Sequence, residues 1–163
     1  MFTIFVFKIK TDKMKYSLLA IVCAFLVSCS SGPAKDFSTI NEKQITDYIK
    51  TNKLDATKSE SGLYYVVDEA GEGVQPTSAS TVQVAYRGSY LNGEVFDESG
   101  ERGISFPLKR VIKGWTEGIT YFKEGGKGIL LIPSHLGYGP YDTRGIPGGS
   151  VLIFDIHLIE VKK

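Results

Sequence analysis

The spacing of apolar residues divides the chain beyond its N-terminal region into two parts. Residues 41–53 have the spacing of an amphipathic helix, with apolar side chains at Ile40, Ile45, Tyr48, Ile49 and Leu54. Ser38, Thr39 or Asn41 is available to cap its N-terminus. From Gly62 onward, apolar residues recur at every second position, which is typical of strands with one buried face. We expect the helix to pack on the following domain or to extend it, and a role in dimerisation stays open.

Six segments with period-two or continuous apolar sequence predict strands, at residues 63–67, 81–91, 94–97, 104–108, 127–133 and 151–161. One face of the last segment carries Leu152, Phe154, Ile156 and Leu158. Asn92-Gly93 is a two-residue hairpin signal. Residues 134–150 form a long glycine-rich loop, and a loop of this length in a small domain usually carries function.

A short helix is predicted between the fourth and fifth strands, in the stretch VIKGWTEG at residues 111–118. Trp115, Ile119 and Phe122 fall at i, i+4 and i+7 and share one face. A helix this short is unstable alone, because most helical stability comes from burial against another element. The sequence therefore predicts an α+β domain in which a curved antiparallel β-sheet is wrapped around one short α-helix.

The N-terminal region has the features of a secretory signal sequence. From Met14, a basic start is followed by an apolar run and then by small Ser28. The run is too short to span a bilayer comfortably. Because residues 1–13 precede a complete signal sequence, we expect translation to start at Met14.

The end of this signal sequence, LVSC at residues 26–29, resembles the lipobox of bacterial lipoproteins. The resemblance implies removal of residues 1–28, lipidation of Cys29 and a place in the bacterial cell envelope. An ordinary signal peptide with an incidental cysteine is the alternative. Cys23 lies in the segment to be removed, so the mature chain has no second cysteine with which to form a disulfide.

The 163 residues, 42% of them hydrophobic, allow one domain with an appendage. We expect a lipidated tether over residues 29–40, a helical extension over residues 41–58 and the domain over residues 60–163. Removal of the signal sequence takes away four of the 19 basic residues and one of the 18 acidic residues. The remaining 15 basic and 17 acidic residues give no electrostatic basis for nucleic-acid binding.

Most catalytic arrangements are missing from the sequence. It has no nucleophile elbow, no metal-ligand spacing and no phosphate-binding glycine loop, so we expect neither a metal nor a cofactor. What remains is a set of aromatic and aliphatic residues expected to converge on the short helix, namely Tyr86, Phe96, Val111, Ile112, Trp115, Tyr138 and Phe154. A role in the core alone would explain most of them. A phenol in the glycine-rich loop, however, is more typical of a ligand site than of a core.

Four segments occur in the order and spacing of the FKBP family of peptidyl-prolyl cis-trans isomerases, namely AYRGSYLNGEVFDES, FPLKRVIKGWTEG, KEGGKGILLIPSHLGYG and VLIFDIHLIEV. Residues 60–163 thus resemble that family. The resemblance implies a sheet of five or six strands around the short helix, with an apolar pocket between them. It also implies cofactor-independent rotation of Xaa-Pro bonds in envelope proteins, which assists their folding. The expected partners are proline-containing polypeptide segments, and the membrane through Cys29.

Carried over residue by residue, the resemblance implies a catalytic set made of Tyr86, Phe96, Asp97, Trp115, Tyr138 and Phe154. It implies substrate-binding residues at Ile104, Phe106, Val111, Ile112 and Ile146. Gly145 and Gly148 depart from the family pattern at the pocket rim, which leaves open both the substrate preference and the binding of the family's macrolide inhibitors. The alternative function is a non-catalytic chaperone or peptide-binding lipoprotein that uses the same pocket.

Overall fold

A computed structural model describes residues 35–162 of the chain. The predicted signal peptide over residues 1–28, the start at Met14, and Cys29 with the first part of the tether lie outside these residues. Within residues 35–162, no helix combines the length and the apolar character needed to cross a bilayer.

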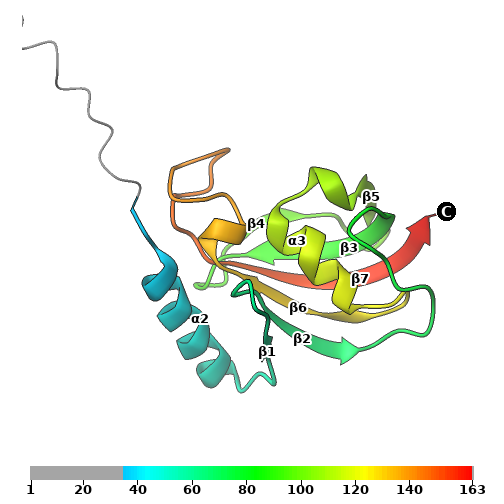
Figure 1. The fold of residues 1–163 in the computed structure, drawn as a ribbon, viewed down its shortest axis with the longest axis horizontal. Coiled ribbons are helices and arrows are strands. Elements are labelled where there is room, and N and C mark those ends of the chain that lie inside the picture. Colours follow the sequence, from blue (N-terminus) through cyan, green and yellow to red (C-terminus); the bar gives the residue numbers. More distant parts are fainter. Residues whose placement is uncertain (1–34, 163) are drawn as a thin grey trace, which may run out of the picture. The chain divides into compact units, whose positions relative to one another are not determined.

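The sheet is antiparallel throughout and has seven strands (Figure 1). These are β1 (Thr57–Lys58), β2 (Tyr64–Glu69), β3 (Thr81–Ser89), β4 (Val95–Glu98), β5 (Ile104–Pro107), β6 (Lys127–Ile132) and β7 (Leu152–Lys162). Their order is β1-β2-β6-β7-β3-β4, and β5 also pairs with β3. The predicted α+β class is confirmed, and all six predicted strands are present within two residues of their expected ends. The sheet exceeds the expected five or six strands because β1, only two residues long, is too short to show a period.

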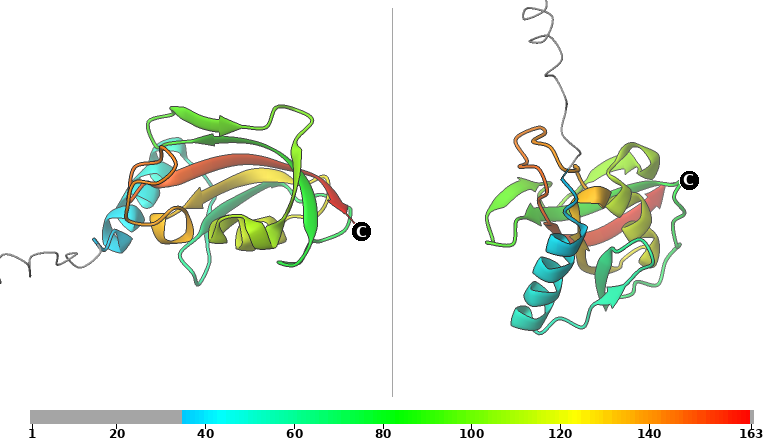
Figure 2. Two further views of the ribbon diagram at one scale, coloured as in Figure 1. Left: turned by 90° about the horizontal axis from the view of Figure 1, so that it is seen from above. Right: turned by 60° about the vertical axis from the view of Figure 1, so that its left-hand side comes forward.

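The short helix lies across one face of the sheet (Figure 2). Helix α3 (Lys113–Gly118) continues as the 3-10 helix η2 (Ile119–Tyr121). Its predicted inner face is confirmed, because Trp115 is 5% exposed and Ile119 and Phe122 are fully buried. Glycine allows the close approach of α3 to β6, since a Cβ on Gly114 would lie 2.6 Å from the Ile132 side chain.

The N-terminal helix packs on the opposite face of the sheet. Helix α2 (Ser38–Asn52) places fully buried Ile45 in a cluster with Tyr64, Leu131, Val151 and Ile153. It begins three residues earlier than expected. The expected caps at Ser38, Thr39 and Asn41 are wrong, because the N-cap is Phe37, which makes no side-chain cap hydrogen bond. The side chain of Asn41 bonds instead to a distant loop.

Two short 3-10 helices complete the described chain. Helix η1 (Leu108–Arg110) leads into α3, and η3 (Ser134–Leu136) opens the long loop before β7. Both therefore stand beside the segments that enclose the candidate site.

Candidate active site

A cavity of about 600 Å³ lies between α3, the sheet and the glycine-rich loop. This size is within the usual range for small-molecule sites. Its walls come from β3, β4, β5, β7, the α3 region and the loop, and it is lined by Tyr86, Asp97, Ile104, Phe106, Arg110, Val111, Ile112, Trp115, Gly137, Tyr138, Thr143, Arg144 and Phe154. Nine of the eleven expected site residues thus share one cavity.

Two expected site residues do not line this cavity. Phe96 is half-buried and meets the Phe154 ring edge-on, with 5.5 Å between the ring centroids. Ile146 is 7% exposed and belongs to the hydrophobic core, while its backbone pairs with Thr143 within the loop. Phe96 thus contacts a lining residue through its ring, and Ile146 contacts one through its backbone.

Four lining residues were not expected from the sequence: Arg110, Gly137, Thr143 and Arg144. Arg110 directly precedes Val111, and its exposed position gives no periodic signal. Arg144 has φ 51° in the loop, a conformation uncommon for a residue other than glycine. Val111 was expected to bind substrate, and the position of Arg110 next to it was the one sequence feature that could have predicted its place in the cavity.

Aromatic rings form the floor and sides of the cavity. Tyr86 and Phe154 meet the Trp115 ring edge-on, with centroids 5.0 and 5.2 Å away. Phe106 approaches the same indole at 5.2 Å. Such pairs add stabilisation beyond the burial of their area. Within residues 35–162, the indole N–H of Trp115 is a buried donor without a hydrogen-bond partner.

One carboxylate lies at the edge of this apolar surface. The Tyr86 hydroxyl donates a hydrogen bond of 2.7 Å to Oδ2 of Asp97. Burial, followed by the hydrogen bond to Asp97, raises the pKa of the Tyr86 phenol above its ordinary value. The phenol therefore stays protonated at neutral pH and directs its donor at the carboxylate.

The segment before α3, with Val111 and Ile112, also lines the cavity. Ile112 is the extended N-cap of α3, and its carbonyl accepts bonds from the N–H groups of Trp115 and Thr116. The N–H of Ile112 donates to no other group in the described part of the chain. A donor with this placement suits a substrate carbonyl.

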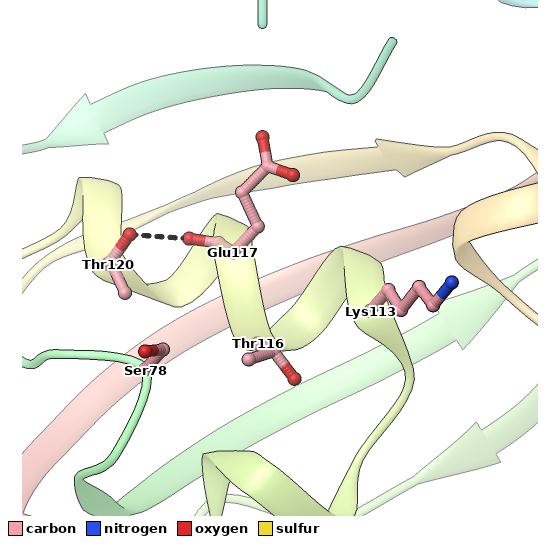
Figure 3. Close-up of a pocket in the computed structure, with 5 residues that line it drawn as sticks. All are labelled: Ser78, Lys113, Thr116, Glu117 and Thr120. Carbon is pink, nitrogen blue, oxygen red and sulfur yellow. Dashed lines mark hydrogen bonds between the residues drawn. The ribbon is translucent and has the colours of Figure 1, made fainter. Parts of the chain in front are cut away.

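A second hollow, of about 490 Å³, lies on the outer side of α3 (Figure 3). It is lined by Ser78, Lys113, Thr116, Glu117 and Thr120. The Thr120 hydroxyl donates to the Glu117 carbonyl at 2.6 Å, so part of this surface serves the helix itself. No aromatic ring lines it. The same short helix thus borders one cavity that is lined by aromatic rings and one that is not.

The comparisons with known proteins agree with this geometry. Residues 72–159 match the family model described as FKBP-type peptidyl-prolyl cis-trans isomerase. The chain is 48% identical over 109 residues to the FKBP-type peptidyl-prolyl cis-trans isomerase FkpA of Buchnera aphidicola, a match that covers 65% of this chain and 43% of that protein. The chain therefore spans less than half the length of that relative.

Two further matches extend over the N-terminal helix. A probable FKBP-type peptidyl-prolyl cis-trans isomerase of Haemophilus influenzae is 39% identical over 159 residues, covering 93% of this chain and 65% of that protein. The crystal structure of FkpA from Escherichia coli superposes with a TM-score of 0.70 at 38% identity, over 93% of this chain and 72% of that chain. With its sheet, its short helix and the matched segment, the chain belongs to the family of FKBP-type peptidyl-prolyl cis-trans isomerases.

Proposed function

We propose that the protein is a peptidyl-prolyl cis-trans isomerase that acts on Xaa-Pro bonds of polypeptides in the cell envelope and assists their folding. The observation that carries this proposal is the aromatic cavity over Trp115, in a chain that belongs to this family. The domain over residues 60–163 would carry the activity.

The chemistry requires no broken covalent bond. Rotation about a peptide bond faces a barrier of about 18–20 kcal/mol, because resonance keeps the amide planar. The planar amide is also the more polar state, with negative charge on its oxygen. Aromatic rings solvate the amide oxygen less well than water does. A site with a floor of such rings therefore disfavours the planar ground state relative to the twisted transition state.

The lining residues have separate roles in this mechanism. The proline ring would lie among Tyr86, Trp115 and Phe154, the three rings that meet edge-on. The Ile112 N–H and the Tyr138 hydroxyl would donate to substrate carbonyls. Asp97, oriented by the Tyr86 hydroxyl, would orient the reacting amide at the cavity edge.

The experiment compares the two sides of α3 in a peptide isomerisation assay. We expect Trp115→Leu, which keeps an apolar side chain at the floor, to lower kcat/KM by at least about tenfold, the equivalent of one lost contact of moderate strength. Lys113→Ala, which changes the outer hollow on the same helix, is the control. A folded Trp115→Leu variant with full activity would show that the cavity assignment is wrong.

We also propose the lipoprotein form, with translation from Met14, cleavage before Cys29 and a tether over residues 29–40. The sequence LVSC at residues 26–29 supports this proposal. Cys29→Ser should abolish incorporation of a labelled fatty acid, whereas Cys23→Ser should reduce it little. A peptide from residues 1–13 recovered from cells would contradict the start at Met14.

Macrolide inhibitors of the family are candidate ligands of the same cavity. Competition between such a compound and a proline peptide would test this, and an unchanged peptide affinity would exclude it.

A further inference from the structure

A single buried amide joins α2 to both ends of the loop that carries Tyr138. Asn41 is fully buried in a helix whose neighbouring positions are mostly exposed. Its Oδ1 accepts a bond of 2.9 Å from the N–H of Ser134, and its Nδ2 donates a bond of 2.9 Å to the carbonyl of Gly149. In Figures 1 and 2 this loop, drawn in orange, lies beside the N-terminal end of α2, drawn in blue.

The two residues that Asn41 binds are also linked to each other through Gly139, by their other backbone groups. The Gly139 N–H donates to the Ser134 carbonyl at 2.8 Å, and the Gly149 N–H donates to the Gly139 carbonyl at 2.9 Å. Gly139 directly follows Tyr138, which lines the cavity. A short series of hydrogen bonds therefore runs from α2 to the backbone beside this phenol.

A packing contact supports the same connection. The Phe37 ring lies so close to Gly149 that a Cβ at that position would overlap it. Because Phe37 is the N-cap of α2, the start of the helix covers the end of the loop. The loop is thus held through one amide and one ring, both from α2.

We propose that Asn41 is a positioning residue for the isomerase site, which fixes the loop of residues 134–149 and with it Tyr138. The effect on activity rests on the proposed function, whereas the effect on the loop does not. A buried N–H or carbonyl that loses its partner carries a desolvation penalty, so the loop is expected to rearrange when the amide is removed.

The test compares Asn41→Ala with Ile45→Ala in the full chain. Both positions are fully buried and lie about one helical turn apart on α2, so both variants lose buried contacts of this helix. We expect only Asn41→Ala to speed hydrogen exchange at the amides of Gly139 and Gly149, which donate the hydrogen bonds within the loop. We further expect it to lower kcat/KM about tenfold, mainly through KM, in the range of one hydrogen bond.

Unchanged exchange in Asn41→Ala, or equal effects of both variants on exchange and KM, would overturn the proposal. An inactive wild-type protein whose loop still loosens in Asn41→Ala would instead contradict the proposed function and leave the positioning role standing.

A separate observation concerns the charge at the cavity rim. Two arginines, Arg110 and Arg144, line the cavity from opposite segments, and Asp97 is the one carboxylate among its lining residues. Neither arginine takes part in an ion pair within residues 35–162. Arg144 and Gly145 have φ 51° and 81°, in a turn closed by two hydrogen bonds between Thr143 and Ile146. These positive φ values are those of a tight hairpin turn, which defines the backbone conformation at Arg144.

We infer that these arginines select substrates with an acidic residue close to the proline, given the proposed function. In an assay with matched peptides, Glu beside the Xaa-Pro unit should give a kcat/KM about tenfold above that with Lys at low ionic strength, and salt should reduce this ratio. Arg110→Gln and Arg144→Gln should lower the ratio, whereas Lys109→Gln, with the same loss of charge outside the cavity lining, should not.

Equal turnover of the Glu and Lys peptides would overturn the inferred preference while leaving the isomerase function intact. Absence of turnover with every peptide, including a neutral one, would instead contradict the proposed function.

Discussion

Neighbouring residues of β7 belong to two different environments. Phe154 faces α3 and borders the aromatic cavity, whereas Ile153 faces α2 in a mostly aliphatic cluster. Both side chains are at most 3% exposed. Burial alone therefore does not distinguish the two faces of the sheet, and the difference lies in what each face encloses. The α3 face holds a cavity of about 600 Å³, and the α2 face supports the loop that closes this cavity.

The largest expected effect is a loss of activity when the cavity face of β7 is changed, and the same change on the α2 face should affect stability instead. Phe154→Ala should lower kcat/KM by about a hundredfold or more, because it removes a wall of the cavity and a ring that contacts Trp115. Ile153→Ala should cost about 2–5 kcal/mol of unfolding free energy. Its folded fraction should keep near-normal activity. Denaturant unfolding and the peptide assay on the same samples check both statements. Equal activity losses in Phe154→Ala and Ile153→Ala would show that the two faces of β7 do not differ in function.

A smaller effect is expected from crowding the rings of the cavity face. A Cβ on Gly88 would lie 2.8 Å from both the Phe96 and Phe154 rings. Gly88→Ala should therefore cost about 1–3 kcal/mol of unfolding free energy through overpacking, and displaced rings should lower activity. Urea denaturation gives the first value. A variant with wild-type stability and activity would show that Phe96 does not brace Phe154.

The hydroxyl of Tyr86 should matter less than the rings. Tyr86→Phe removes the donor to Asp97, a bond expected to contribute about 0.5–1.5 kcal/mol, so we expect a severalfold loss in kcat/KM. Tyr48→Phe, a change on the α2 face, is the matched control. Similar activities for both variants would show that the hydrogen bond from Tyr86 to Asp97 has no part in catalysis.

The smallest effect concerns the dependence of stability on pH. The pKa of Tyr86 is raised in the folded state, mainly by burial, so the folded protein holds this proton more tightly than the unfolded chain. The corresponding stability is fully present below the ordinary tyrosine pKa of about 10 and is lost as pH rises above it. Unfolding free energies between pH 9 and 11 should fall less steeply in Tyr86→Phe than in the wild type, and identical slopes would contradict this assignment.

The sequence predicted those parts of the molecule that follow a regular period. Alternation along residues 151–161 identified β7 and its inner face, and the i, i+4, i+7 spacing identified the buried face of α3. Gly114 and Gly118 carry no apolar signal, so the closeness of α3 to β6 was not foreseen. Periodicity reports burial, and it therefore located the apolar floor of the site better than its rim.

The remaining features depend on contacts between distant residues. Asn41 was expected to cap its own helix, since asparagine is common at that position. Besides Gln44 in the same helix, however, its partners lie 93 and 108 residues away. Arg144 reaches the cavity through a loop turn that no period describes. Such contacts become visible only when the fold brings the segments together.

The central claim, that the cavity over Trp115 catalyses proline isomerisation, is tested most directly on the lipid-free fragment from residue 30 onward. The measurement is the rate of cis-trans exchange of an Xaa-Pro peptide with catalytic amounts of protein, alongside the affinity for the same peptide. Uncatalysed exchange takes about tens to hundreds of seconds. We predict a strong acceleration with weak, saturable binding. Tight peptide binding with no acceleration would contradict the claim and favour a chaperone that holds proline-containing segments without turnover.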